Sequence, residues 1–256
     1  MKTKILFPIV LLLILSCSHI DEDERLLYVK PVAVSSSVLI EDFTGQRCIN
    51  CPSATDEILR LQELYGEEAV IAVAIHCGPF AFTTNSRLVG LKNDLGDEYY
   101  NYWHPDHQPI GMINRGEMLD YSAWNAEVRE YLQQTSPVSI NLSTVVFEGI
   151  LSVQVEVMGT DGDTDGHLQV WLVEDNIVAF QLLPDGTRRD DFLHRHVLRA
   201  AVNGTWGTPI RVTEGETSEF RFSNFPLDDE WTVSELSVVA FVYNERGVCQ
   251  VTSRHV

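Results

Sequence analysis

The sequence predicts a fold of two parts, an α/β domain followed by an all-β sandwich. Between residues 35 and 135, short apolar runs typical of buried strands alternate with amphipathic stretches typical of helices. Beyond Ser136 and Pro137 the helical periodicity stops, and runs rich in β-branched and aromatic residues recur between turn residues. Alternating strands and helices favour a layered α/β domain, whereas strands in succession favour an antiparallel sandwich. We therefore predict domains over residues 35–135 and 136–256.

The first residues are typical of an export signal. Lys2 and Lys4 precede about eleven mostly apolar residues, too few for the roughly 20 that a transmembrane helix needs, so we expect residues 1–16 to be removed. Cys17 follows Ile-Leu-Ser and resembles the cysteine of a bacterial lipobox, which implies that it carries lipid as the mature N-terminus. The same resemblance implies the outer membrane, on its periplasmic or surface side. The alternative is a conventionally cleaved signal peptide that leaves Cys17 unmodified.

An acidic tether is expected over residues 17–34, before the first domain. Four consecutive acidic residues, 21–24, should stay solvated there rather than fold. The whole chain has a net charge of −19, from 18 basic and 37 acidic residues. Nucleic acid is therefore not expected as a partner, because phosphate contacts need clustered Lys and Arg.

The expected elements follow from the periodicity of each run. In the first domain a strand begins at Val38 and a helix follows Pro52, and the later elements are a strand, a helical insert, a hairpin and a helix, over residues 69–75, 85–102, 108–117 and 124–132. In the second domain the expected strands cover residues 138–147, 150–158, 167–173, 178–183, 209–212, 218–222, 233–243 and 247–252.

Cys48 and Cys51 stand at C-x-x-C spacing between the first predicted strand and its helix. Gly45 interrupts the strand, and Pro52 fits a first helical turn because it needs no backbone hydrogen-bond acceptor there. The N-terminus of a helix stabilises a thiolate, and an exported protein enters a compartment that permits disulfides. The spacing therefore predicts a local disulfide between Cys48 and Cys51, either redox-active or structural.

In this region the chain resembles the thioredoxin-like superfamily. Asp42 lies six residues before Cys48, where that family has a buried carboxylate, and residues 108–117 resemble its cis-proline strand and hairpin. The resemblance implies that Cys48 attacks a partner disulfide, that Cys51 resolves the mixed disulfide, and that Asp42 relays the proton of Cys51. It also implies that Pro109 shapes the edge that binds a peptide, and that no cofactor is needed. The family's usual Gly-Pro between the cysteines is absent here.

The remaining cysteines and the histidines give weaker signals. Cys77 and Cys249 could form a bridge between the domains or remain separate buried thiols, since sequence does not fix connectivity. His104 and His107 have the spacing of metal ligands, and His194 and His196 alternate as on one face of a strand; neither pair has a recognisable set of further ligands. We therefore predict no metal site.

A wider resemblance covers nearly the whole mature chain. Residues 41–45, 48–52, 113–115 and 194–207 together resemble the 28-kilodalton outer-membrane lipoprotein family. That family implies a thioredoxin-like domain followed by an immunoglobulin-like β-domain, tethered to the membrane by its N-terminal lipid. Two functions stay open. One is thiol-disulfide exchange on exported proteins; the other is non-enzymatic binding or adhesion at the surface, with a structural disulfide.

Overall fold

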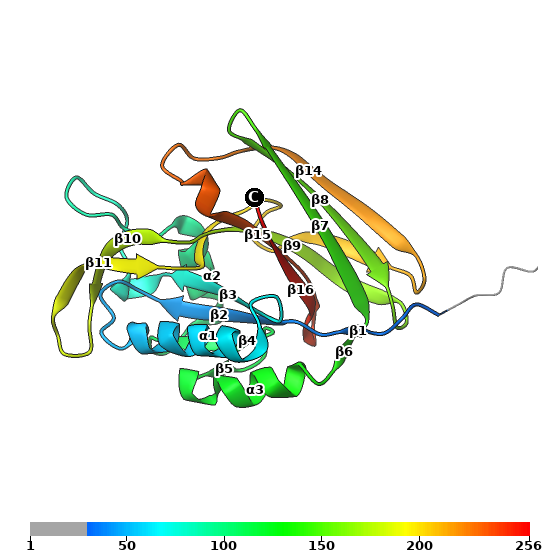
Figure 1. The fold of residues 1–256 in the computed structure, drawn as a ribbon, viewed down its shortest axis with the longest axis horizontal. Coiled ribbons are helices and arrows are strands. Elements are labelled where there is room, and N and C mark those ends of the chain that lie inside the picture. Colours follow the sequence, from blue (N-terminus) through cyan, green and yellow to red (C-terminus); the bar gives the residue numbers. More distant parts are fainter. Residues whose placement is uncertain (1–29) are drawn as a thin grey trace, which may run out of the picture.

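The computed structural model describes residues 30–256 (Figure 1). The predicted signal peptide, Cys17 and most of the acidic tether lie outside the described residues. Within residues 30–256 the helices are α1 (Cys51–Tyr65), α2 (Asp94–Trp103) and α3 (Trp124–Tyr131), and the strands are β1 (Val34–Ser35), β2 (Val38–Thr44), β3 (Val70–His76), β4 (Ile110–Ile113), β5 (Met118–Leu119), β6 (Thr135–Ser136), β7 (Val138–Phe147), β8 (Ile150–Gly159), β9 (Thr164–Glu174), β10 (Ile177–Leu182), β11 (Arg188–His194), β12 (Val197–Ala201), β13 (Thr208–Val212), β14 (Thr217–Pro226), β15 (Leu236–Asn244) and β16 (Gly247–His255).

A nine-stranded sheet runs through the whole molecule. Its order is β16-β15-β9-β12-β3-β2-β4-β5, and β13 also pairs with β9. Strand β12 lies parallel to β3, with Val197 opposite Ala74, and the backbone N–H of Ala74 donates to the carbonyl of His196 over 2.7 Å. Residues from both halves of the chain therefore hydrogen-bond within one sheet.

The predicted fold class, an α/β thioredoxin-like domain followed by an immunoglobulin-like sandwich, is wrong. The chain is mostly β, and its strands form several sheets, the largest of which crosses the expected boundary near Ser136. The physical reason lies at the edge of β3. An unpaired strand edge leaves backbone donors and acceptors unsatisfied, and β12 pairs with the β3 edge at Ala74. Whether residues 35–135 and 136–256 fold independently is a separate matter, and that division stays a prediction.

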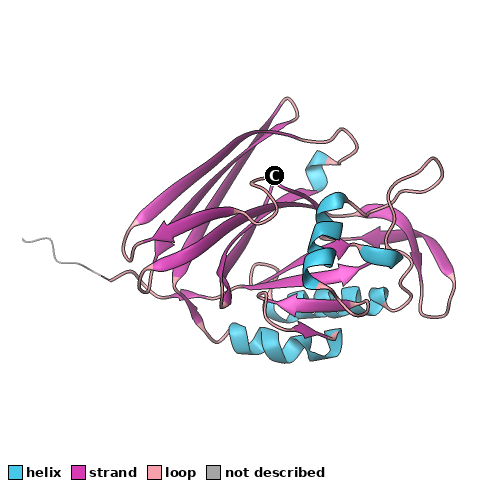
Figure 2. Ribbon diagram, turned by 180° about the vertical axis from the view of Figure 1, so that it is seen from behind, coloured by secondary structure: helices cyan, strands magenta, loops and turns pink. Residues whose placement is uncertain are grey.

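Alternating side chains place the central sheet between separate hydrophobic cores. Phe241 on β15 packs with Trp171 and Tyr99 in an aromatic-rich cluster on one face, whereas Val238 and Ala240 face the other side. There they pack against the three-stranded sheet β14-β8-β7, so this part of the molecule is two sheets face to face. Figure 2 shows the helices gathered around the opposite end, where α1 and α3 cover β2 and β3.

Several predicted boundaries differ from the observed ones. The helical insert expected over residues 85–102 is a helix only from Asp94, and a loop precedes it. Strands β11 and β12 were not predicted, and His194 and His196 do not share a strand face. His194 ends β11, and His196 turns the chain with a φ of 57° before β12.

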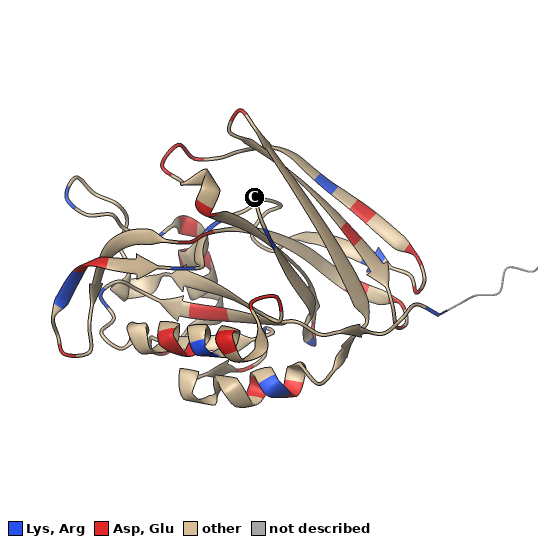
Figure 3. Cartoon of the chain, viewed as in Figure 1, with Lys and Arg blue, Asp and Glu red and all other residues tan. Residues whose placement is uncertain are grey.

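The part of the chain that the structure describes has no helix suited to span a membrane, and its basic residues are dispersed along the chain. No helix within residues 30–256 is long and apolar enough to cross a bilayer. Figure 3 shows the Lys and Arg residues of this part scattered among Asp and Glu rather than gathered into a stripe.

Candidate functional site

The Cys48–Cys51 disulfide lies at the start of α1, where the C-x-x-C spacing predicted it. The two Cα atoms are 5.4 Å apart, Asn50 stands at the N-cap position without a side-chain capping bond, and Cys51 is the first residue of α1. Gly45 allows the preceding turn, because a Cβ there would lie 2.5 Å from the backbone carbon of Phe80. Both cysteines are buried, with 3% of Cys48 and 2% of Cys51 exposed. Other parts of the chain therefore cover the disulfide.

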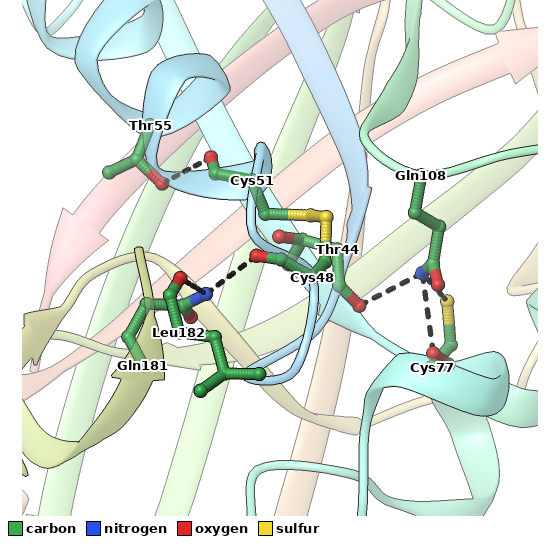
Figure 4. Close-up of a disulfide and its surroundings, with 8 residues drawn as sticks. All are labelled: Thr44, Cys48, Cys51, Thr55, Cys77, Gln108, Gln181 and Leu182. Carbon is green, nitrogen blue, oxygen red and sulfur yellow. Dashed lines mark hydrogen bonds between the residues drawn. A yellow bond between two sulfur atoms is a disulfide. The ribbon is translucent and has the colours of Figure 1, made fainter. Parts of the chain in front are cut away.

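The β10–β11 hairpin supplies part of this cover (Figure 4). The side-chain amide of Gln181 donates to the carbonyl of Cys48 over 2.8 Å. The backbone N–H of Leu182 donates to the carbonyl of Gln46 over 2.9 Å, and the Gln46 amide donates in return to the carbonyl of Phe180 over 3.2 Å. The hairpin is thus bonded to the loop that carries Cys48.

Asp42 is the buried carboxyl expected near the dithiol. It lies on β2, where alternation places it on the side of Val38 and Ile40, which pack against α1. Only 1% of Asp42 is exposed, and its Oδ1 has no hydrogen-bond partner within residues 30–256. Burial disfavours the carboxylate and raises the pKa of Asp42 to about 8. Near neutral pH this group is therefore mainly a neutral acid that can release a proton.

Gln108 and Cys77 lie across Thr44 from the disulfide (Figure 4). The Gln108 amide donates to the carbonyls of Thr44 and Cys77, over 3.0 and 3.3 Å. The peptide bond between Gln108 and Pro109 is cis. Cys77 is fully buried, and burial raises the pKa of its thiol well above the ordinary value. Cys77 is consequently a thiol rather than a thiolate at neutral pH, and it is a poor nucleophile.

Of the two alternatives for Cys77 and Cys249, a bridge or separate thiols, the structure shows separate thiols. Both residues are free thiols. Cys77 belongs to the aromatic-rich cluster on one face of the central sheet, whereas Cys249 packs against the sandwich cluster on the other face. The sheet separates the two side chains, and this geometry is the physical reason why they cannot pair.

The histidines have protein partners rather than metal-ligand neighbours. His107 contacts the carboxylates of Asp106 and Asp120, over 2.7 and 3.1 Å. His194 is buried, and His196 lies 3.1 Å from the carboxylate of Asp175. No group of three or more His, Cys, Asp or Glu residues that could hold a metal ion occurs within residues 30–256.

Sequence reasoning missed a buried ion pair between Glu41 and Arg115. Nε of Arg115 lies 3.4 Å from Oε1 of Glu41, and the guanidinium carbon lies 4.1 Å from the ring centre of Tyr243. Burial raises the pKa of Glu41, and the Arg115 charge opposes that shift. A charged residue inside the apolar strand β2 was the available signal. No comparable local signal connects Gln181 with Cys48, because their contact spans distant parts of the sequence.

Comparisons with known proteins place the chain in a family. Residues 96–256 match the model of the family described as outer membrane protein Omp28. Among solved structures, the chain is similar to HBP35 of Porphyromonas gingivalis at 16% identity and a TM-score of 0.69, over 89% of this chain and 77% of that one. At this identity the similarity concerns the fold alone.

A second solved structure is a domain of the outer membrane lipoprotein Omp28 from Porphyromonas gingivalis. It aligns at 24% identity and a TM-score of 0.34, over 47% of this chain and 88% of that one. Among curated proteins, no sequence matches the chain significantly. The family match covers more than half of the chain, and it confirms the predicted family and the predicted outer-membrane location. The chain belongs to the Omp28 outer membrane protein family.

Proposed function

We propose that this outer-membrane protein exchanges disulfides with exported proteins through Cys48 and Cys51. The observation that carries the proposal is Asp42, a buried carboxyl group with a pKa near 8 on the strand that leads to the dithiol. A buried acid with an unsatisfied oxygen costs folding free energy, so a structural disulfide alone gives no reason to keep it. An acid that is neutral near pH 7 can supply the proton that a departing thiolate requires.

The exchange balances as two displacements at sulfur. A thiolate of the partner attacks Sγ of Cys48, the Cys48–Cys51 bond breaks, and Cys51 leaves as a thiolate that takes the proton of Asp42. A second thiolate of the partner then attacks the partner's own sulfur in the mixed disulfide. Cys48 leaves as a thiolate and is protonated by solvent, which also reprotonates Asp42. Two electrons pass from the partner's dithiol to the Cys48–Cys51 pair, and the reverse reaction begins with attack by Cys48.

Trapping of the mixed disulfide tests the proposal. In Cys51→Ala the thiol of Cys48 can attack a partner disulfide, but no second thiol resolves the product. We expect this variant to form a covalent adduct with scrambled, unfolded ribonuclease, visible by non-reducing electrophoresis and mass spectrometry. Cys48→Ala is the matched control, because the resemblance assigns the attack to Cys48 and this variant lacks that thiol. Equal absence of adducts in both variants would contradict the proposal.

A second candidate function is non-enzymatic binding, with the disulfide as a structural brace. The observation that favours it is burial, since only 3% of Cys48 and 2% of Cys51 are exposed. Exchange needs a sulfur that a partner can reach. The trapping experiment separates the two functions, because a permanently covered pair captures no partner.

A further inference from the structure

The β10–β11 hairpin lies outside both large sheets and is held in place by its buried residues, among them Phe180 and Gln181. Among the described strands, β10 and β11 pair only with each other and belong to neither the central sheet nor the sandwich. Val178 is 58% exposed and Leu193 is 39% exposed, so part of the hairpin's apolar surface is not packed. A two-stranded hairpin is marginally stable by itself. Its position therefore depends on the contacts it makes with the rest of the molecule.

Both ends of the hairpin turn at residues in the left-handed region. Asn176 and His196 each have a φ of 57°, which is uncommon for residues other than glycine. The base of the hairpin is fixed at these turns, because the backbone N–H of His196 donates to the carboxylate of Asp175, the residue before Asn176, over 2.7 Å. A cavity of about 500 Å³ adjoins β10 and is lined in part by Ile177 and Trp231. The hairpin has a fixed base, a turn at each end and space beside it.

The hairpin's bonds to the disulfide loop resemble those of a bound polypeptide. The loop presents two backbone carbonyls, those of Gln46 and Cys48, and the hairpin donates to them from a backbone N–H and a side-chain amide. An extended peptide uses donors of the same kind when it adds to an exposed backbone. While the hairpin is in place, these acceptors are occupied and Cys48 is shielded.

An aromatic contact holds the hairpin closed. Phe180 on β10 stacks on Phe82, with ring centres 5.3 Å apart and planes 19° apart. Phe82 belongs to a segment that contacts the disulfide loop at Arg47. The backbone N–H of Arg47 donates to the carbonyl of Phe80, and the Arg47 guanidinium carbon lies 4.9 Å from the centre of the Phe82 ring. The stack therefore joins the hairpin to a second segment beside the disulfide loop.

We propose that the β10–β11 hairpin is an internal competitor of the partner polypeptide. Closed, it covers Cys48 and occupies the carbonyls of Gln46 and Cys48; swung away about Asn176 and His196, it frees them for an extended, cysteine-containing segment of an exported protein. This inference rests on the proposed exchange activity, which it deepens by naming an unfolded polypeptide as the substrate class and the hairpin as the control of access.

Reduction kinetics of the full chain test the proposal. The Cys48–Cys51 disulfide is reduced with dithiothreitol or with reduced, unfolded ribonuclease, and the free thiols are counted by alkylation and mass spectrometry. Gln181→Ala removes the hydrogen bond from the hairpin to Cys48. Phe82→Ala removes the aromatic stack with Phe180 by changing a residue outside the hairpin. Thr187→Ala is the matched control, because within residues 30–256 the Thr187 side chain bonds only to Asp185, in the hairpin turn.

We expect the disulfide of both test variants to be reduced roughly three- to tenfold faster than that of the unmodified chain, because each variant loses one modest contact. The control should keep the rate of the unmodified chain. Opening of a hairpin exposes little surface, so the rates should depend only weakly on low urea concentrations. Wild-type rates in Gln181→Ala and Phe82→Ala would overturn the proposal. So would a urea dependence as steep as that of global unfolding.

The outcomes also separate the cover from the exchange activity. Faster reduction by dithiothreitol in both variants, without adducts in Cys51→Ala, would support the hairpin as a cover and contradict exchange with polypeptides. Adducts in Cys51→Ala, with unchanged reduction rates in the hairpin variants, would support exchange and overturn the hairpin's role.

Discussion

Replacement of Asp42 by Asn should stabilise the protein at neutral and alkaline pH. Asn has nearly the same shape but carries no charge, so it removes the cost of ionising a carboxyl group that is 1% exposed. Burial raises the folded-state pKa of Asp42 to about 8, above its ordinary value of 3.8. The unfolded state therefore ionises first. The loss of folding stability caused by burying Asp42 is smallest below pH 3.8, and it grows as the pH rises towards 8.

The expected size of the effect follows from that pKa shift. Each pKa unit is worth about 1.36 kcal/mol, so full ionisation of Asp42 costs on the order of 5 kcal/mol of stability. Most of this penalty develops between pH 5 and pH 8, where it grows by roughly 3 to 4 kcal/mol. The stability difference between Asp42→Asn and the unmodified chain should increase by that amount over the same interval.

Denaturant unfolding at pH 5 and pH 8, with the disulfide intact, measures this difference. Asp56→Asn is the matched control, because Asp56 lies exposed on α1, so its replacement should change stability little at either pH. A pH-independent difference for Asp42→Asn, or a larger destabilisation at pH 8 than at pH 5, would show that burial does not raise the pKa of Asp42. The same variant should slow the resolution of mixed disulfides without preventing the first attack, because only the proton of Cys51 is affected.

Three further predictions concern the hairpin, the anchor and the domains. Burial lowers the pKa of His194 to about 4, below its ordinary 6.5, so its contribution to stability should fall by roughly 2 kcal/mol between pH 7 and pH 4.5; in denaturant unfolding, the stability of His194→Gln relative to the unmodified chain should increase by that amount over the interval. Cys17→Ser should leave the membrane fraction, because the predicted anchor is the lipid on Cys17; an unchanged distribution on fractionation would contradict that anchor. Proteolytic cleavage at the exposed residues Gln133 and Gln134 should yield two pieces that stay associated on gel filtration, even under reducing conditions, because β12 pairs with β3. Separation into two folded pieces would instead show independent domains.

Local features of the fold were predictable from the sequence. The strand that contains Asp42, the turn at Gly45 and the disulfide at the start of α1 all follow from residue types at fixed spacing. Strand β7 was predicted with its observed boundaries, because its alternating apolar residues face the sandwich core. In each case neighbouring residues carry the physical signal, either as a hydrophobic period or as a turn residue.

Features that depend on distant pairing were not predictable. Strand β12 pairs with the edge of β3, more than 100 residues earlier in the chain, and no local pattern encodes that partner. The run Arg188-Arg189-Asp190-Asp191 is too polar to indicate a strand, yet it forms part of β11 because the strand pairs in an exposed hairpin. The hydrogen bond from Gln181 to Cys48 arises only from this arrangement, so the cover over the disulfide could not be read from the sequence.

The reduction potential of the Cys48–Cys51 pair distinguishes disulfide exchange from a structural brace. The full chain is equilibrated with dithiothreitol or glutathione redox buffers of known potential, and the fraction of disulfide is measured after acid quenching and alkylation. Structural disulfides of exported proteins usually lie below about −300 mV, whereas exchange-active pairs lie above that value. We predict a potential above about −300 mV for Cys48–Cys51. A value below it would identify the bond as a structural brace and contradict disulfide exchange.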